Sequence, residues 1–246
     1  PPLEPGEPAR DPNQLPVLVV LHQHHSNPGH VGQWFRRNGH ALDVRRHFAG
    51  DPLPATRENH CGAVIFGGPQ SANDKLQFIR DEIEWIGVAL KEKKPFLGIC
   101  LGAQMLAQHL GARVDHCRHG SVEIGYHPVR RTREGTVLGE LPDLVYQWHR
   151  EGFDIPSGAR LLATSDGLYP NQAMSYGPAA FGVQFHPEIT FAQVNRWSGS
   201  NPTRLLMRGA RPRHHHMESH LVHGPRVQTW LDGFLRRWVR SAVHSG

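Results

Sequence analysis

The sequence predicts an α/β fold with a central, mostly parallel sheet, helices on both faces and a small antiparallel extension. Three observations predict it. In the first half, short apolar runs alternate with amphipathic stretches, which is typical of parallel strands joined by helices. These runs are continuous, as in strands buried on both faces. In the second half, short strand-like runs follow one another directly, and this favours antiparallel pairing.

The first half supplies the parallel strands and their helices. Strands are expected over residues 15–21, 41–44, 63–66 and 95–99. Helices are expected over about 27–39, 74–94 and 101–110. Asn27-Pro28 would begin the first helix, and Gly39 and Gly111 would end the first and the last.

The second half supplies the antiparallel part and a closing helix. Strands are expected over residues 122–129, 144–148, 160–164 and 180–185. Near the end of the chain, apolar residues recur at helical spacing: Val227, Trp230, Leu231, Phe234, Leu235 and Trp238. We interpret this stripe as the buried face of a helix rather than as a cofactor site.

The chain of 246 residues is long enough for one α/β domain or two small ones. Residues 1–14 are rich in proline and charge, so a disordered leader is expected there. The main domain is expected over residues 15–190. A helical extension over residues 191–246 is expected to pack on the same domain.

The composition excludes several classes of protein. The longest aliphatic run is too short to span a bilayer and no signal peptide opens the chain, so no membrane association is expected. The three cysteines lack pair spacing, which indicates a reducing compartment and predicts a cytoplasmic protein. The net charge is +5, with nine arginines from Arg196 onward. We interpret these arginines as a solvated face, and nucleic-acid binding is not expected.

The most informative motif places a cysteine between the fourth strand and its helix, in Gly98-Ile99-Cys100-Leu101-Gly102. The pattern Gly-x-Cys-x-Gly is the cysteine version of the nucleophile elbow. The helix N-terminus favours a thiolate over a thiol. The backbone N–H of Leu101 would face the anion formed when sulfur attacks a carbonyl, and Gly67 or Gly68 could supply a second donor.

A second motif supplies the partner for this cysteine. In Gly182-Val-Gln-Phe-His186-Pro-Glu188, a histidine ends a strand and a carboxylate follows two residues later. Glu188 can hydrogen-bond one ring nitrogen of His186 and leave the other for the thiol. The two motifs together predict nucleophilic catalysis by Cys100.

The stretches "IFGGPQSAND", "PFLGICLGAQMLAQHLGA", "EIGYHPV" and "GVQFHPE" resemble the class I, or triad, glutamine amidotransferases. They are most similar to stand-alone proteins related to the glutaminase domain of GMP synthase. The resemblance covers about residues 16–190 and implies a flavodoxin-like fold. It also implies hydrolysis of the glutamine side-chain amide through a γ-glutamyl thioester with release of ammonia, without metal or cofactor.

The resemblance also implies roles for single residues. Cys100 is the nucleophile, His186 the general base and acid, and Glu188 the residue that orients it. Gly68 and Leu101 match the donors of the oxyanion hole. The residues expected to contact or line the substrate site are Gln104, Gly67, Gly120, Ser121 and His149.

Two groups of histidines offer rival interpretations. His149 with Glu151 is an alternative base and carboxylate, although a role in shaping the glutamine pocket or its lid is favoured. The histidines at 214–216, 220 and 223 could suggest a metal site, but a solvated loop is favoured because no other ligand spacing accompanies them.

Three functions stay open from the sequence. The protein could release ammonia for a separate synthase, because no ATP-pyrophosphatase motif is present and the basic C-terminal region could dock a partner. It could instead hydrolyse γ-glutamyl amines or peptides. A narrow sealed channel would favour ammonia, and an open groove would favour a peptide. A regulatory module without activity is the third reading, and the intact Cys100, His186 and Glu188 argue against it.

Overall fold

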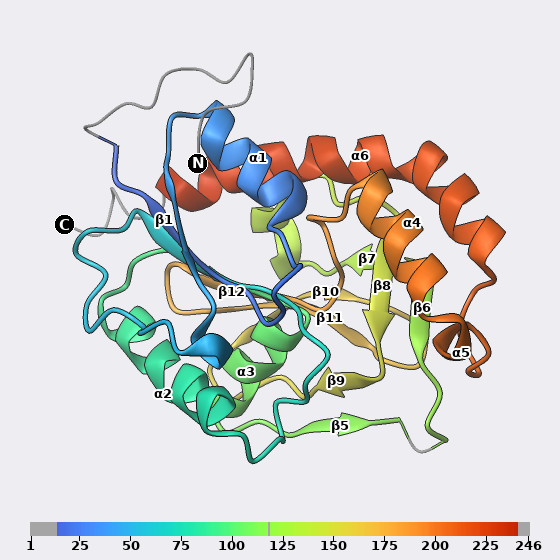
Figure 1. Cartoon of the computed structure of the whole chain (residues 1–246), viewed down its shortest axis with the longest axis horizontal. Coiled ribbons are helices and arrows are strands. Elements are labelled where there is room, and N and C mark those ends of the chain that lie inside the picture. Colours follow the sequence, from blue (N-terminus) through green and yellow to red (C-terminus); the bar gives the residue numbers. More distant parts are fainter. Residues whose placement is uncertain (1–13, 118, 241–246) are drawn as a thin grey trace.

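An eight-stranded sheet, in the order β2-β1-β3-β4-β12-β11-β10-β7, forms the centre of the protein (Figure 1). The computed structural model describes residues 14–117 and 119–240. The strands, in sheet order, are β2 (Leu42–Arg45), β1 (Val17–Val20), β3 (Gly62–Ile65), β4 (Phe96–Ile99), β12 (Ala180–Val183), β11 (Asn171–Tyr176), β10 (Arg160–Thr164) and β7 (Arg130–Arg131).

The strands from β2 to β12 run parallel, and β11, β10 and β7 continue the sheet in antiparallel fashion. The predicted fold class is therefore confirmed. The pairing of β4 with β12 determines where the candidate site residues lie. Ile99 is in register with Val183, so Cys100 and His186 leave the sheet at the same edge although they are far apart in sequence.

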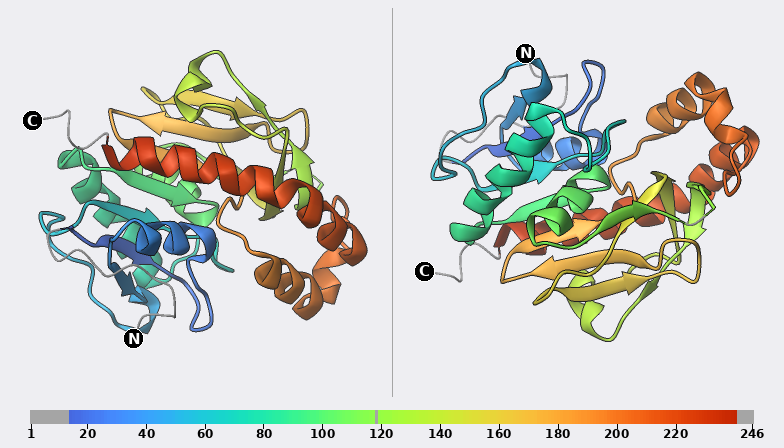
Figure 2. Two further views of the ribbon diagram at one scale, coloured as in Figure 1. Left: turned by 90° about the horizontal axis from the view of Figure 1, so that it is seen from above. Right: turned by 90° about the horizontal axis from the view of Figure 1, so that it is seen from below.

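Two layers of helices cover the sheet, as the continuous apolar runs predict. Val17 and Val19 of β1 belong to the core shared with α1 (Gly29–Arg37) and α6 (Arg213–Arg240). Leu18 and Val20 point to the other face, where α2 (Gln77–Lys91) and α3 (Leu101–His109) pack. Figure 2 shows α6 lying across the sheet beside α1.

Smaller elements surround the edge of the sheet at which Cys100 and His186 lie. Two antiparallel strand pairs lie beside it: β5 (Val114–His116) with β9 (Glu151–Phe153), and β6 (Glu123–Pro128) with β8 (Leu144–His149). The 3₁₀ helices are η1 (His47–Ala49) and η2 (Glu134–Leu138). The short helices α4 (Phe191–Ser200) and α5 (Pro202–Leu205) connect β12 to α6.

The predicted elements of the first half are present within a few residues of their expected bounds. In the second half, the predicted strands correspond to β6, β8, β10 and β12, while β5, β7, β9 and β11 were not predicted. The strand over 180–185 was expected in the antiparallel part, but β12 pairs parallel with β4. Helices α4 and α5 lie within the helical extension expected over residues 191–246. The predicted apolar stripe from Val227 to Trp238 is buried against the sheet. Its interpretation as core packing is confirmed.

The solvated loop expected around the clustered histidines is wrong. Residues 213–223 form the first turns of α6, and His216 and His220 are buried. Nδ1 of His216 pairs with the hydroxyl of Tyr146 at 2.9 Å, and Nδ1 of His220 with the hydroxyl of Tyr126 at 2.7 Å. These contacts attach the N-terminal half of α6 to β6 and β8.

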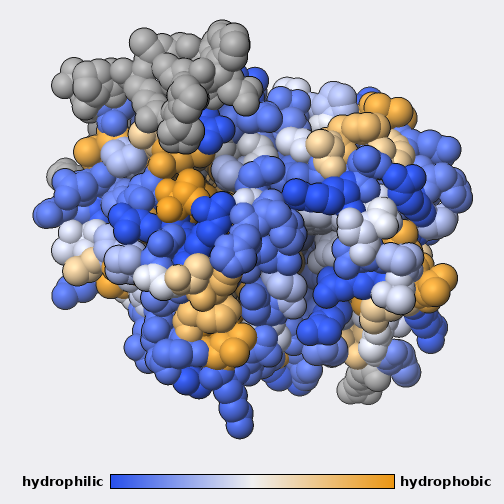
Figure 3. All heavy atoms as spheres, in the orientation of Figure 1, coloured by the Kyte–Doolittle hydropathy of each residue, from blue (hydrophilic) through white to orange (hydrophobic). Residues whose placement is uncertain are grey.

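The expected leader over residues 1–14 lies outside the described residues apart from Gln14. Within residues 14–117 and 119–240, no helix combines the length and apolarity needed to cross a membrane. The face shown in Figure 3 is mostly hydrophilic, with scattered apolar patches. Leu206, Leu221 and Val222 are among the exposed large apolar residues.

Candidate active site

Cys100 lies at the predicted turn between β4 and α3, and its backbone is strained. Its φ of 51° and ψ of −103° fall in a region that residues with a side chain rarely adopt. The flanking glycines let the elements meet. A Cβ at Gly102 would lie 2.1 Å from the carbonyl oxygen of Ile65, and a Cβ at Gly98 would lie 2.4 Å from that of Gly102. The turn therefore holds the thiol, 6% exposed, at the edge of the sheet.

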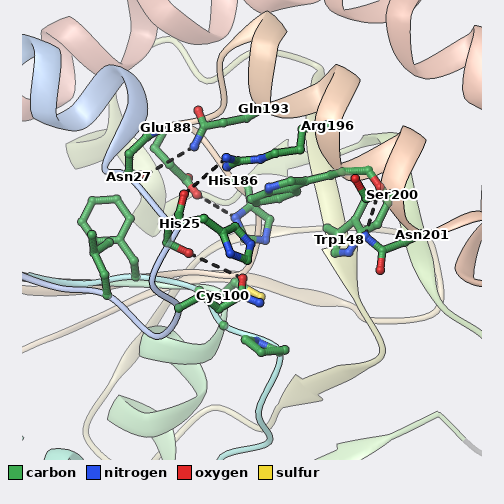
Figure 4. A pocket seen from close by; sticks show the side chains of 18 of the residues that line it. His25, Asn27, Cys100, Trp148, His186, Glu188, Gln193, Arg196, Ser200 and Asn201 are labelled. Carbon is green, nitrogen blue, oxygen red and sulfur yellow. Dashed lines mark hydrogen bonds and ion pairs between the residues drawn. The ribbon is translucent and has the colours of Figure 1, made fainter. Parts of the chain in front are cut away.

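His186 and Glu188 form the predicted pair behind the thiol (Figure 4). Nδ1 of His186 lies 2.8 Å from Oε1 of Glu188, and both side chains are buried. His186 and Cys100 pack on the same glycine. His186 Cε1 and Cys100 Cβ lie 2.7 and 3.4 Å from the point that a Cβ of Gly67 would occupy. A side chain at position 67 would therefore wedge between nucleophile and base.

The surroundings of His186 favour its protonated form. Burial by itself lowers the pKa of His186, but the carboxylate of Glu188 and the thiol of Cys100 raise it above the ordinary value of 6.5. Nε2 of His186 has no other hydrogen-bond partner within the described residues. Trp197 of α4 covers the ring edge-on, with 5.0 Å between the ring centroids. The site is thus built to hold an imidazolium at position 186.

The two predicted oxyanion donors lie on either side of the thiol. Leu101 is the first residue of α3, so its N–H has no acceptor within the helix. Gly68 belongs to the turn after β3, and it lines both cavities that reach Cys100. His22 supports this turn. Nδ1 of His22 lies 3.3 Å from the carbonyl oxygen of Gly67, and its Nε2 lies 2.7 Å from Oε2 of the fully buried Glu82.

Two glutamines connect the thiol to the rest of the site. The amide of Gln184 donates to the sulfur of Cys100 over 3.7 Å. The predicted Gln104 donates to the side-chain oxygen of Gln184 at 3.3 Å and to the carbonyl oxygen of Glu151 at 2.9 Å. Gln184 was not predicted, although it stands two residues before His186 in the same motif.

Two cavities meet at Cys100. The larger, of about 320 Å³, lies on the side of His186 and Glu188 and is walled by α4 and α5. The smaller, of about 30 Å³, lies on the side of Gln104. Both are lined by Gly68, Pro69, Cys100, Trp148 and Arg204. Trp148, Trp197 and Arg204 were not predicted, although Trp148 directly precedes His149 in a segment expected to shape the pocket.

Of the other residues predicted to bind the substrate, only some line the cavities at Cys100. His149 lines the smaller cavity, but its Nδ1 lies 3.0 Å from the carbonyl oxygen of Glu151 and its Nε2 lies 3.2 Å from Oε2 of Glu123. Because both ring nitrogens are engaged, this geometry does not support His149 as the base. Gly120 is exposed, and the carbonyl oxygen of Ser121 accepts from the hydroxyl of Tyr169. Neither Gly120 nor Ser121 lines either cavity.

The described part of the chain contains no group of three or more His, Cys, Asp or Glu side chains arranged to hold a metal ion. His216 and His220 of α6 instead pair with tyrosine hydroxyls, as described above. The arrangement around Cys100 consists of a thiol, an imidazole, a carboxylate and backbone N–H groups, which together suit attack on an acyl carbon.

Comparison with known families agrees with this geometry. The family model described as "Glutamine amidotransferase class-I" matches residues 24–195, more than half of the chain. The protein belongs to the class I glutamine amidotransferase family. The matched range contains Cys100, His186 and Glu188, together with both cavity-lining turns after β3 and β4.

Individual relatives cover different parts of this amidotransferase. It is 31% identical over 188 residues to the glutamine amidotransferase-like protein YfeJ of Salmonella typhimurium, and the match covers 72% of this chain and 77% of that protein. It is 32% identical over 142 residues to one subunit of the glutamine-hydrolysing GMP synthase of Sulfurisphaera tokodaii, covering 56% and 72% of the two chains.

Solved structures extend the similarity beyond the matched family range. A glutamine amidotransferase from Methylobacillus flagellatus superposes with a TM-score of 0.86 at 26% identity, covering 93% of this chain and 96% of that one. One from Thermotoga maritima gives 0.83 at 32% identity, covering 92% and 99%. The fold of this class I amidotransferase, including most of its helical C-terminal part, is therefore shared with these structures.

Proposed function

We propose that the protein hydrolyses the side-chain amide of glutamine through a γ-glutamyl thioester on Cys100 and releases ammonia. One observation carries the proposal: Cys100 and His186 pack against the same glycine, with Glu188 hydrogen-bonded to the far side of the imidazole. Membership in a family of generally cysteine-dependent amidohydrolases supports it.

In the first half of the reaction, the thiolate of Cys100 attacks the amide carbon and the carbonyl oxygen becomes an anion. The N–H groups of Gly68 and Leu101 stabilise this oxyanion. The carbon–nitrogen bond then breaks, and the imidazolium of His186 gives its proton to the departing nitrogen. Ammonia leaves, and the glutamyl group stays on sulfur as a thioester.

In the second half, neutral His186 takes a proton from a water molecule, which attacks the thioester carbon. The carbon–sulfur bond breaks, glutamate leaves and the thiolate is restored beside the imidazolium. Glu188 keeps the same ring nitrogen of His186 aimed at the reacting atoms in both halves. No step needs a metal or a cofactor.

The glutamyl part of the substrate is proposed to lie on the side of the thiol where Gln104 and His149 stand. Gly67 lines the opposite cavity, next to His186. Gly120 and Ser121 are left out of the proposed substrate site because they line neither cavity.

The ammonia acceptor is proposed to be a separate synthase. This proposal is supported by the GMP synthase relatives in which the matching chain is one subunit of the enzyme. The basic C-terminal region is a candidate surface for such a partner. A cytoplasmic location is proposed because Cys61, Cys100 and Cys117 are free thiols rather than disulfides.

The test is to incubate the purified protein with glutamine and to measure glutamate and ammonia, beside Cys100→Ala and the control Cys61→Ala. We expect equal amounts of the two products from the wild type and Cys61→Ala, and none from Cys100→Ala. A mass increase of one glutamyl group on the quenched wild-type protein should map to Cys100. Glutamine hydrolysis that survives in Cys100→Ala would refute the mechanism.

A further inference from the structure

A buried pair of a histidine and a carboxylate lies behind the turn that follows β3. Nε2 of His22 lies 2.7 Å from Oε2 of Glu82 in α2, and neither side chain is exposed. Oε1 of Glu82 has no hydrogen-bond partner within residues 14–117 and 119–240. A buried carboxylate with one unpartnered oxygen is costly to the fold. The stability of the fold is therefore a poor explanation for this pair.

His22 contacts the peptide unit that joins Gly67 to Gly68. Nδ1 of His22 lies 3.3 Å from the carbonyl oxygen of Gly67, and a carbonyl oxygen only accepts, so Nδ1 carries the hydrogen. The peptide between the two glycines is trans, and the carbonyl oxygen and the N–H of a trans peptide point in opposite directions. The contact that holds the carbonyl oxygen towards His22 therefore aims the N–H of Gly68 away from His22.

The turn lies between His22 and the thiol. The point that a Cβ of Gly67 would occupy is 3.4 Å from Cβ of Cys100, and the corresponding point at Gly68 is 2.7 Å from Cβ of His22. Gly68 lines both cavities that reach Cys100, and its N–H donates to no backbone acceptor in the described part of the chain. An N–H that points away from His22 therefore points to the side on which the thiol reacts.

A peptide between two glycines needs such a contact to stay in one orientation. Glycine adopts a wide range of torsion angles, so this peptide can turn over without a large movement of its neighbours. In the reversed orientation, its carbonyl oxygen would face the oxyanion and repel it. The reversal would also leave the buried Nδ1–H of His22 without an acceptor, which is unfavourable. The hydrogen bond from His22 therefore favours the orientation that suits the reaction.

We propose that His22 and Glu82 are positioning residues that hold the peptide between Gly67 and Gly68 with its N–H aimed at the oxyanion. Glu82 fixes the imidazole through Nε2, and Nδ1 of the imidazole fixes the peptide. Neither side chain lines a cavity at Cys100, so both act through the turn rather than on the substrate. The inference rests on the proposed function, because an oxyanion forms only if the thiolate attacks an acyl carbon.

The test separates acyl transfer from the reactivity of the thiol. Hydrolysis of glutamine passes through an oxyanion, whereas alkylation of Cys100 by iodoacetamide displaces iodide and forms none. The double variant His22→Leu/Glu82→Leu replaces the pair with apolar side chains and leaves no unpaired charge. We expect its kcat for glutamine to fall by ~10- to 100-fold, towards the ~10²–10³-fold value of a complete oxyanion donor. KM and the alkylation rate should stay close to those of the wild type, because the lost interaction exists only in the transition state.

Conservative variants of the pair should retain most of kcat. His22→Asn keeps a donor for the carbonyl oxygen of Gly67, and Glu82→Gln keeps a hydrogen-bond partner for Nε2 of His22. His60→Leu is the matched control. His60 is also buried and pairs with a carboxylate, since its Nε2 lies 2.9 Å from Oδ2 of Asp43, but it lines neither cavity and does not contact the turn. His60→Leu should hydrolyse glutamine as fast as the wild type.

A measurement on the wild-type protein does not depend on how the variants fold. In protein labelled with ¹⁵N-histidine, the signal of Nδ1 of His22, assigned by its loss in His22→Asn, should be that of a protonated nitrogen. An unprotonated Nδ1 would overturn the inference. So would wild-type kcat in the double variant. A parallel loss of hydrolysis and alkylation would overturn it as well, because the pair would then act on the thiol of Cys100.

The two proposals fail in different ways. A wild-type protein that forms the thioester at Cys100, together with a double variant that hydrolyses glutamine equally fast, refutes this inference alone. A wild-type protein that forms no thioester and releases no glutamate refutes the proposed function, and the role inferred for His22 and Glu82 with it.

Discussion

The side-chain amide of Gln184 donates a hydrogen bond to the sulfur of Cys100 over 3.7 Å. A donor aimed at the sulfur stabilises the thiolate more than the neutral thiol. The carbonyl oxygen of the same amide accepts from Gln104, which fixes which end of Gln184 faces the sulfur. The glutamine two residues before the base therefore acts on the nucleophile.

We predict that Gln184→Leu, which keeps the approximate volume and removes the donor, lowers kcat/KM by roughly tenfold, the value of one hydrogen bond to a charged group. Alkylation of Cys100 by iodoacetamide near neutral pH should slow in parallel. Gln108→Leu on α3, the helix that follows Cys100, is the control and should change neither rate. An unaltered alkylation rate in Gln184→Leu would show that the sulfur does not depend on this amide.

Removing the charge of Glu188 should change the pH dependence as well as the rate. The carboxylate raises the pKa of His186, so Glu188→Gln lowers that pKa. Because His186 must be protonated to expel the leaving nitrogen, the alkaline limb of the kcat/KM profile should move to lower pH. A loss of ~10²-fold or more in kcat is expected for a disturbed general acid.

The control for Glu188→Gln is Glu218→Gln, which removes an exposed carboxylate from α6. Its pH profile should match that of the wild type. Should the alkaline limb of Glu188→Gln stay in place or move upward, the carboxylate would not be what holds the proton on His186.

The close approach of α3 to β3 depends on the lack of a side chain at position 102. A Cβ there would lie 2.1 Å from the carbonyl oxygen of Ile65, and a backbone atom cannot move aside cheaply. Gly102→Ala should therefore lower the free energy of unfolding by at least ~2 kcal/mol, as for other overpacked sites. Urea unfolding followed by circular dichroism measures this change.

Gly233→Ala in α6 is the matched control, because a Cβ there meets nothing closer than 3.5 Å. Alanine is the better helix former, so this variant should be as stable as the wild type or more stable by up to ~1 kcal/mol. A Gly102→Ala protein as stable as Gly233→Ala would mean that α3 can shift along the sheet without cost.

The buried His220 should make the fold sensitive to acid. Burial lowers the pKa of His220 to about 4, whereas in the unfolded chain it returns to its ordinary 6.5. Between pH 4 and pH 6.5 the unfolded state binds the proton more readily than the folded state does. The contribution of neutral His220 to the free energy of unfolding is therefore complete above pH 6.5 and is lost as the pH falls towards 4. This one group contributes a slope of up to about 1.4 kcal/mol per pH unit.

Urea unfolding between pH 4 and 7 tests this slope. His220→Gln removes the titrating group, so the variant should have the shallower dependence. His214→Gln, at an exposed position of the same helix, should keep the wild-type slope. Equal slopes for His220→Gln and the wild type would assign the acid sensitivity to other groups.

The sequence was most informative where a local pattern carries the chemistry. The turn around Cys100 needs glycines on both sides, and His186 needs a carboxylate near it, so both motifs are short and recognisable. The fold class and the two motifs that hold the candidate nucleophile and the candidate base were therefore predictable. The register that brings them together was not predicted, because Ile99 and Val183 end parallel strands that are far apart in the sequence, and the second of these strands was expected in the antiparallel part.

Parts of the site that depend on tertiary placement were not predictable. Strand β11 was missed because its buried Gln172 and Ser175 resemble surface residues, and partners such as the amide of Gln147 satisfy Gln172 only in the folded state. Helix α6 runs through Gly224-Pro225, with His216 and His220 buried before this pair and Val227 and Trp230 buried after it. Arg204 reaches the cavity through the path of α4 and α5, which no motif encodes.

Holding a sulfur at position 100 requires a strained backbone at that residue. Glycine tolerates the observed torsion angles far better than a residue with a Cβ. Cys100→Gly and Cys100→Ala both lack the thiol and should both be inactive. Cys100→Gly should have the higher melting temperature of the two. The difference between their two melting temperatures would measure the conformational strain that a side chain at this turn imposes on the fold.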